Sequence, residues 1–324
     1  MTGGINRRAF LGAAAGSAMA IQVGEALGAE SPGSDAASPR EVRLEYLKPK
    51  EVDEAIEACP VLFQPLGTIE WHGLHNIVGV DALKAHGLCC RAAEQGGGLV
   101  APPLYGGVGG VDQPHTFVIE PENSLFSVLL RSWLERLASE AVRQGFRAVI
   151  FLTGHYGAAQ QIVVRETAVR MSRTLGVPVL GTPEYFLALD EGYHGDHAAW
   201  GETVLMMYLY PESVDLSRLG EPPHQGVGGR DPREATQADG ERVATAIINR
   251  LAALARQMPT WDRATLERFV AAEAALVTRQ QALAAEEKTI WAGWRNIGKG
   301  HFDAYGRLLA EGRFEDIVKL VEKL

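Results

Sequence analysis

An uninterrupted apolar run in the middle of the chain, Ala148–Thr153, constrains the fold more than any other feature. A strand that is buried on both faces of a parallel sheet has such a continuous run, whereas a half-exposed strand alternates between apolar and polar residues. We therefore predict a buried strand at this segment. Three other runs predict further strands of the same sheet: Val61–Leu66, Leu99–Ala101 and Val177–Gly181, the last weakened by its proline.

Helical patterns alternate with these apolar runs. Such alternation is typical of α/β proteins, in which helices cover both faces of a parallel sheet. The sequence therefore predicts an α/β fold with a mostly parallel sheet and helices on both faces. The predicted helices cover Ala82–Gln95, Ser124–Gln144, Ala158–Leu175 and Glu202–Tyr210.

The chain from Thr260 onward is rich in Ala, Glu, Arg and Leu, and it predicts two or three more helices. Trp291 and Trp294 lie three residues apart there, as do Phe302 and Tyr305. Such an aromatic stripe belongs to a core or an interface more often than to a cofactor site. This helical C-terminal extension is an oligomer contact, a lid or a small appended unit, and the sequence does not choose between these.

The first residues have the pattern of an export signal. Arg7 and Arg8 are followed by Ala-Phe-Leu and then by the apolar run Gly12–Val23, an arrangement that resembles a bacterial twin-arginine signal. The run is too short, and too rich in Ala and Gly, for a membrane span, so no stable membrane anchor is expected. We predict a periplasmic or otherwise extracytoplasmic protein. The alternative is a cytosolic tail in which the arginine pair is accidental.

These features divide the chain into four predicted parts. Residues 1–29 form the signal peptide, and residues 30–40 form a linker of Ser, Pro, Gly, Asp and Ala. Residues 41–258 form the domain that contains the predicted sheet, and residues 259–324 form the helical extension. The formal net charge is −9 and no basic patch or stripe is present, so no nucleic-acid partner is expected.

A cluster of metal-ligating residue types follows the first predicted strand. Glu70 and His72 lie two residues apart, so on an extended chain their side chains point to the same side, and Asp81 follows after a short loop. His155 follows the strand Ala148–Thr153 by two residues. Because ligands in open α/β sheets collect beyond the carboxyl ends of the strands, we expect these side chains to converge. Carboxylates with imidazoles suit Zn²⁺ or Mn²⁺.

Four ordered segments of the sequence resemble the motifs of the creatininase family of metal-dependent amidohydrolases. The resemblance covers roughly Val61 to Leu254, and four motifs in order are far more specific than any one of them. It implies the same class of fold, a small-molecule amide substrate, two divalent ions and a homo-oligomer. Zn²⁺ and Mn²⁺ are the expected ions, with Fe²⁺ as a further candidate. The segments are Gly67–His75 with Val80-Asp81, Thr153–His155, His197–Thr203, and Gly226–Arg233.

The resemblance also implies a role for each motif residue. Glu70 and His155 correspond to ligands of the first metal, Asp81 to the bridging carboxylate, and His72 to a ligand of the second metal. His197 would move a proton to the leaving nitrogen; its alternative is a hydrogen-bonded structural histidine. Together these roles predict hydrolysis of an amide or cyclic amide, at a carbon–nitrogen bond other than a peptide bond, by a metal-activated water.

The chain departs from the family pattern at two positions. In the enzyme that gives the family its name, a Glu supplies the second metal's remaining ligand, and Gly157 stands at that position here. Glu202 is the obvious replacement, although it could instead cap a helix. Trp71 stands where the family usually has Gln. Two alternatives therefore stay open: a non-catalytic exported metal- or solute-binding protein on the same fold, and a creatininase-like peptidase or deformylase.

Overall fold

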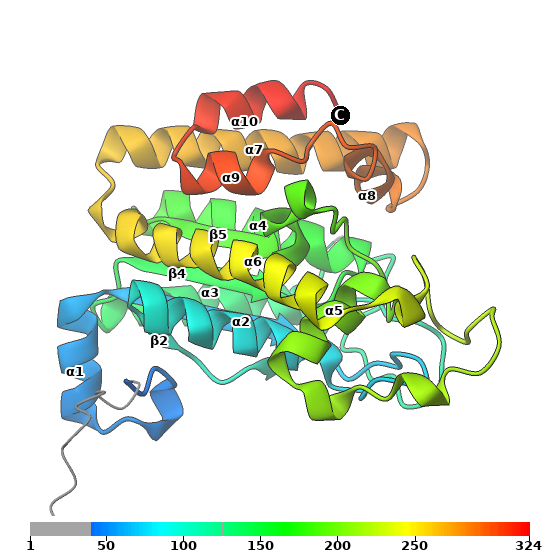
Figure 1. Ribbon diagram of the computed structural model, residues 1–324. Helices are drawn as coiled ribbons and strands as arrows, with labels where there is room; N and C mark the ends of the chain where they lie inside the picture. The colour runs from blue at the N-terminus through cyan, green and yellow to red at the C-terminus, as the bar shows by residue number, and fades with distance from the viewer. Residues whose placement is uncertain (1–39, 125) are drawn as a thin grey trace, which may run out of the picture. The chain divides into compact units, whose positions relative to one another are not determined.

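Five parallel strands form one sheet at the centre of the molecule in this computed structural model, which describes residues 40–124 and 126–324 (Figure 1). The order across the sheet is β2-β1-β4-β5, and β3 pairs with the end of β1. The predicted signal and nearly all of the predicted linker lie outside the described residues. The strands are β1 (Val61–Gly67), β2 (Leu99–Val100), β3 (Leu104–Tyr105), β4 (Ala148–Thr153) and β5 (Val179–Pro183).

Helices cover both faces of this sheet, as predicted (Figure 1). On one face, α2 (Val80–Gly96) and α6 (Gln237–Gln257) enclose a core with inward side chains of the strands such as Phe63 and Ile150. On the other face, α3 (Val128–Arg143) and α4 (Ala158–Leu175) pack over neighbouring strand residues. The alternate residues of each central strand therefore enter different cores, which explains why nearly all of its residues are apolar.

The predicted C-terminal extension is helical and packs on the rest of the fold. Its longest helix, α7 (Arg263–Glu286), lies against α4, and α9 (Tyr305–Ala310) lies against α6 (Figure 1). Phe302 and Tyr305 stack with their ring centroids 5.1 Å apart and are fully buried in the same core as α6. The remaining helices are α1 (Pro49–Ala58), α5 (Trp200–Leu209), α8 (Ala292–Ile297) and α10 (Phe314–Val321).

Short 3-10 turns complete the described secondary structure. No helix in the described part of the chain is both long and apolar enough to cross a membrane. The turns are Leu44–Tyr46, Glu184–Leu187, Leu189–Glu191, Pro211–Ser213, Leu216–Arg218, Pro232–Glu234 and Met258–Thr260.

The structure differs from the sequence prediction at several element ends. The strand expected from Val177 begins at Val179, after Pro178, which has no N–H for the ladder. The helix expected from Ser124 begins at Val128, because the carboxylate of Glu120 accepts the backbone N–H of Val128 at 2.7 Å and so caps the helix there. The sequence analysis predicted no helix at α1 or α6.

Candidate metal centre

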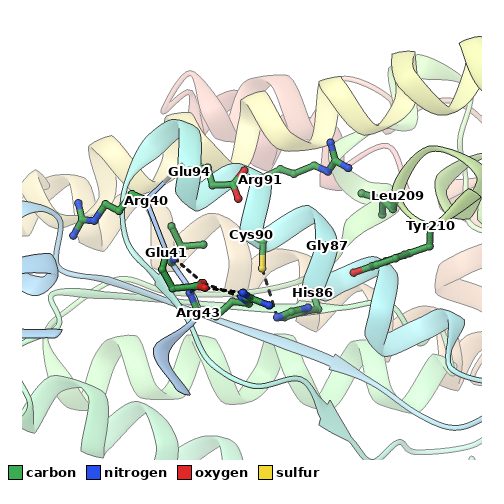
Figure 2. Close-up of a pocket in the computed structure, with 11 residues that line it drawn as sticks. Arg40, Glu41, Arg43, His86, Gly87, Cys90, Arg91, Glu94, Leu209 and Tyr210 are labelled. Carbon is green, nitrogen blue, oxygen red and sulfur yellow. Dashed lines mark hydrogen bonds and ion pairs between the residues drawn. The ribbon is translucent and has the colours of Figure 1, made fainter. Parts of the chain in front are cut away.

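Two of the cavities in the described structure are lined by histidine side chains. One, of about 510 Å³, lies between the segment Arg40–Arg43 and the middle of α2 (Figure 2). Arg43 Nη2 lies 2.6 Å from Glu41 Oε2 there, and His86 and Cys90 are neighbours on one helix turn, with Nε2 and Sγ 3.5 Å apart. No group of metal-ligating side chains lies in this cavity among the described residues.

The other cavity, of about 340 Å³, lies beyond the carboxyl ends of β1 and β4. Leu66 pairs with Thr153 in the sheet register, so the two strands end side by side and the segments that follow them meet. His72 lies just behind the cavity wall with only 1% of its surface exposed. Predicted site residues that line the cavity are Glu70, Asp81, His155, His197 and Glu202.

Two glycines allow the first turn of α2 to enter this space. A Cβ on Gly67, the last residue of β1, would lie 2.2 Å from the backbone nitrogen of Ala82. A Cβ on Gly154, directly after β4, would lie 2.1 Å from the backbone oxygen of Asp81. Real Cβ atoms do not approach backbone so closely, so both positions require glycine. The strand ends thereby hold Asp81 between the two histidine-bearing segments.

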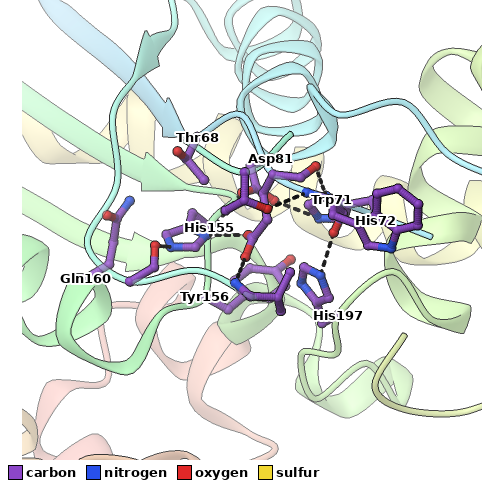
Figure 3. A network of polar contacts seen from close by, with 12 residues as sticks. Thr68, Trp71, His72, Asp81, His155, Tyr156, Gln160 and His197 are labelled. Carbon is purple, nitrogen blue, oxygen red and sulfur yellow. Dashed lines mark hydrogen bonds and ion pairs between the residues drawn. The ribbon is translucent and has the colours of Figure 1, made fainter. Parts of the chain in front are cut away.

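The first candidate metal group consists of Glu70, Asp81 and His155 (Figure 3). His155 Nδ1 lies 3.0 Å from Glu70 Oε2 and 3.1 Å from Asp81 Oδ2. The other ring nitrogen, Nε2, lies 3.1 Å from the carbonyl oxygen of Val108. A carbonyl can only accept, so this contact places a proton on Nε2 and leaves the Nδ1 lone pair of the neutral ring for a metal.

The second candidate metal group consists of His72, Asp81 and Glu202. His72 Nε2 lies 3.1 Å from Asp81 Oδ1 and 3.1 Å from Glu202 Oε2. His72 Nδ1 lies 3.0 Å from the carbonyl oxygen of Glu70 and is therefore the protonated nitrogen. The two oxygens of Asp81 thus face different histidines, which is the arrangement that a bridging carboxylate needs.

The charges of the two groups favour bound cations. Glu70, Asp81 and Glu202 are each at most 2% exposed. Lys84 contributes one positive charge: its ammonium contacts Glu202 and lies 3.7 Å from Asp81 Oδ1 and 3.5 Å from Glu184 Oε1. Burying unpaired carboxylates is costly, so the excess negative charge calls for further cations. Three carboxylates and two oriented imidazoles fit two divalent metal ions.

The pKa values of His72 and His155 reflect the excess of negative charge around them. Burial alone would lower the pKa of His72, but the negative charges of Glu202 and Asp81 outweigh it and hold the pKa well above its usual value. For His155, burial is likewise outweighed by Glu70 and Asp81, and the pKa is again raised well above its usual value. Each imidazole thus lies in a strongly negative field that favours a positive charge beside it.

Glu202 does not cap α5. The carboxylate that accepts N–H groups of the first helical turn belongs to Asp196, with 2.6 Å to Gly201 N and 3.2 Å to Glu202 N. Glu202 Oε2 instead accepts the N–H of Ala198, before the helix, at 2.6 Å. Asp196 therefore accepts the N–H groups of the first turn of α5, and the Oε2 of Glu202 that accepts Ala198 N also faces His72 Nε2.

The carboxylate of Glu122 occupies the space beside Gly157. A Cβ on Gly157 would lie 2.9 Å from Glu122 Oε2 and 3.0 Å from His155 Nε2. Glu122 Oε1 accepts the N–H of Ala158 at 2.6 Å, at the start of α4, and Oε2 has no hydrogen-bond partner. Glu122 belongs to neither metal group. The sequence analysis did not identify Glu122, because it comes from a loop outside the four motifs.

His197 lies beside the second metal group. Its ring centroid is 4.5 Å from that of His72, and its Nε2 lies 2.8 Å from the carbonyl oxygen of Trp71 (Figure 3). Its backbone pairs with Gly228 on both sides, at 2.9 and 2.8 Å. Burial, together with the charge of His72, lowers the pKa of His197, so the ring is neutral near pH 7 with its Nδ1 lone pair free.

Lys84 is a functional candidate that the sequence analysis missed. It follows Asp81 by three residues on α2 and so lies on the same helix face. Its side chain is fully buried, and burial lowers its pKa less than Glu202, Glu184 and Asp81 raise it. The sequence signal, a lysine at i+3 from a ligand, is too common to have identified it.

The sequence from residue 45 to residue 255 matches the family model described as creatininase, creatinine amidohydrolase. The creatinine amidohydrolase of Pseudomonas putida is 32% identical over 190 residues, which cover 50% of this chain and 69% of the relative. The mycofactocin precursor peptide peptidase of Mycolicibacterium smegmatis is 24% identical over 216 residues, which cover 59% of this chain and 82% of the relative.

Solved structures agree with these sequence matches. Creatininase in its Mn form superposes with a TM-score of 0.55 at 27% identity, over 68% of this chain and 100% of that one. A mutant creatininase of the Zn-Zn type gives a TM-score of 0.56 at 25% identity, over 68% and 99%. The extension after residue 255 lies outside the family match, although it belongs to the same core as α6.

Proposed function

The chain belongs to the creatininase family, and we propose that it is a metal-dependent amidohydrolase. Its proposed reaction is hydrolysis of an amide or cyclic amide, at a carbon–nitrogen bond other than a peptide bond. The observation that supports this most directly is Asp81, whose two oxygens face the metal-side nitrogens of His72 and His155. We propose two ions, Zn²⁺ or Mn²⁺. Zn-Zn and Mn forms are known for creatininase.

We propose which residues bind each metal ion. Glu70, Asp81 and His155 would hold one ion, and His72, Asp81 and Glu202 the other. A bound divalent ion lowers the pKa of water to about 7 and polarises a carbonyl oxygen.

We propose that His197 transfers a proton and that Lys84 balances the charge of Glu202. The neutral His197, whose Nε2–H donates to the carbonyl of Trp71, would accept a proton on its free Nδ1 from the attacking water and pass that proton to the leaving nitrogen. Lys84 holds Glu202 ionised: burial raises the pKa of Glu202, but the charges of Lys84 and His72 outweigh it and lower the pKa to about 2.

The size of the cavity favours a small molecule over a polypeptide. A volume of about 340 Å³ is at the lower end of the range typical of small-molecule sites. The match to a peptide peptidase keeps a peptide substrate as the second candidate. A non-catalytic metal-binding protein on the same fold is the third.

Metal content and turnover test the proposal together. Protein purified without chelator is analysed for metals and assayed on cyclic amides, linear amides and a short peptide, before and after EDTA treatment and reloading with Zn²⁺ or Mn²⁺. We expect two ions per chain and turnover that EDTA removes and metal restores. Asp81→Asn, which weakens both groups, should abolish turnover. A metal-free protein with full activity would falsify the proposal, and bound metal without turnover on any amide would favour the non-catalytic alternative.

We further propose a homo-oligomer and export by the twin-arginine route. Support for the oligomer comes from exposed apolar side chains on α3 and in the loop that precedes it, including Phe117, Phe126, Leu129 and Trp133, which are 57–74% exposed. Light scattering that finds only a monomer would count against it. Support for export comes from Arg7 and Arg8 and the apolar run after them.

A further inference from the structure

We infer that Trp291 and Trp294, in the extension beyond the family match, form a wall of the active-site cavity that selects amides with a flat apolar substituent. Both indoles line the same cavity as the two candidate metal groups. The inference rests on the proposed amidohydrolase function, because it names the substrate class of that site.

The two aromatic pairs of the extension have different environments. Phe302 and Tyr305 are fully buried and pack against Phe186 in the core. Trp291 and Trp294 remain 40% and 36% exposed and face the cavity, with ring centroids 6.2 Å apart and an interplanar angle of 82°. An edge-to-face pair of indoles offers both a ring face and a ring edge to a third aromatic ring.

The indoles are held in place by the elements that carry them. The other side of α8 is anchored by Ala292 and Ile297, which are fully buried. The indole N–H of Trp294 donates to the carbonyl oxygen of His194 at 3.3 Å. The imidazole of His194 in turn lies 2.9 Å from Asp303 Oδ1. The extension is thus joined at two points to the loop that leads into His197, so little ordering is needed when a ligand binds.

The lining of the cavity leaves room for a substituent. Gly195, Gly228 and Gly229 line the cavity and have no side chain that would fill it. Val111 adds an apolar surface. A small amide would reach the metal groups without touching the indoles, whereas an amide with an aromatic ring would fill the remaining space and stack on them. Aromatic contact and the burial of a ring then favour the larger substrate.

Two hydroxamic acids test the inference with one common metal-binding group. Acetohydroxamate and benzohydroxamate chelate metals alike but differ in the ring. The dissociation constants are measured by calorimetry on Zn²⁺-loaded protein, so the readout does not depend on turnover. We expect wild type to bind benzohydroxamate about tenfold more tightly than acetohydroxamate. In the double variant Trp291→Ala, Trp294→Ala we expect this preference to disappear, with acetohydroxamate affinity and metal content unchanged.

Matched variants separate the wall from general effects of losing a tryptophan. Trp291→Phe with Trp294→Phe should keep most of the preference. Trp133→Ala, which removes an indole exposed on α3, should leave it unchanged. The inference is overturned if the double alanine variant still prefers benzohydroxamate. It is also overturned if that variant changes its assembly state while its preference for benzohydroxamate stays the same. If neither hydroxamate binds wild type, the proposed metal site is wrong, and both the proposed function and the inference are overturned. Binding of both without preference overturns the inference alone.

Discussion

The carboxylate of Glu202 faces the imidazole of His72, with 3.1 Å between Oε2 and Nε2. Position 157, where the resemblance to the family implies a carboxylate, is here a glycine next to the side chain of Glu122. Asp196 performs the capping at the start of α5. Glu202 is therefore the carboxylate that we propose as a ligand in the second metal group, and replacing it tests whether the residue is a ligand or a structural residue.

Replacing Glu202 with Gln is expected to remove one of two metal ions and most of the hydrolytic activity while the fold survives. A neutral amide is a poorer ligand than a carboxylate, and two protein ligands are one fewer than catalytic zinc usually has. Elemental analysis and thermal unfolding on the same preparation measure both effects. Asp262→Ala is the matched control: it removes the N-cap of α7, where Asp262 accepts Thr265 N at 2.8 Å, and should lower the melting temperature slightly with both metals retained. Two metals retained in Glu202→Gln would assign that residue a structural role.

Replacing Lys84 with Met is expected to destabilise the protein more without metal than with it. Its ammonium contacts Glu202 and Glu184, and removing one partner of a buried ion pair costs about 3–5 kcal/mol of unfolding free energy. A bound cation would neutralise part of the charge left on Glu202. Urea unfolding with EDTA and with Zn²⁺ measures the difference. Equal destabilisation in both conditions would mean that Lys84 and the metal do not share a partner.

His75 is expected to make the metal-free protein less stable as the pH falls. Burial, with repulsion from His72, lowers the pKa of His75 to about 4, whereas in the unfolded chain it is about 6.5. Above pH 6.5 the group is neutral in both states and contributes nothing. Between pH 6.5 and 4 the unfolded chain binds a proton that the folded chain does not, so stability is lost.

The test compares wild type with His75→Gln, which keeps a hydrogen-bonding side chain opposite the hydroxyl of Thr203, now 3.0 Å from His75 Nε2. Unfolding free energies of EDTA-treated protein are measured from about pH 7 to pH 5. The wild-type value should fall more steeply than that of the variant. Parallel curves would show that the pKa of His75 is not lowered in the folded protein.

Part of this architecture follows from local sequence. The run Ala148–Thr153 becomes β4 with the predicted bounds, because a strand buried on both faces must be apolar throughout. Glu70, His72, Asp81 and His155 follow strand ends or start a helix, so a parallel sheet brings them together.

Other features depend on contacts between distant segments. Lys84 meets carboxylates from two distant places in the chain, Glu184 and Glu202, and Glu122 lies in the space beside Gly157. The loop before α5 places Asp196, and not Glu202, where its carboxylate accepts a backbone N–H of the first helical turn. No sequence pattern encodes such pairs. The position of Trp291 and Trp294 over the cavity likewise depends on how the extension packs on the sheet.

Replacing Arg7 and Arg8 with Lys is expected to keep the protein in the cytoplasm. The receptor of the twin-arginine route reads the arginine pair, so the conservative change should block export while net charge is unchanged. Cell fractionation and immunoblotting measure the outcome. Replacing Arg40 with Lys, outside the predicted signal, is the control. Unchanged periplasmic yield of the double variant would contradict the assignment.

Replacing His197 with Gln is expected to remove turnover without removing metal. His197 belongs to neither of the groups that share Asp81, and its Nε2 is engaged by the carbonyl of Trp71. Loss of a positioned proton donor typically slows a reaction about 10²- to 10⁴-fold. Because burial lowers the pKa of His197, the wild-type rate should depend on a group that titrates below the usual histidine range, and the variant should lack that dependence.

The role of His197 is tested by measuring the metal content, kcat and the pH profile of kcat on the amide that wild type hydrolyses fastest. His86→Gln, in the cavity beside Arg43, is the matched control and should keep both metals and the wild-type profile. A His197→Gln enzyme with an unchanged profile and only a lower melting temperature would reduce His197 to a structural link between Trp71 and Gly228. Loss of a metal ion would instead make it a ligand, as its position near Glu70 and His72 also allows.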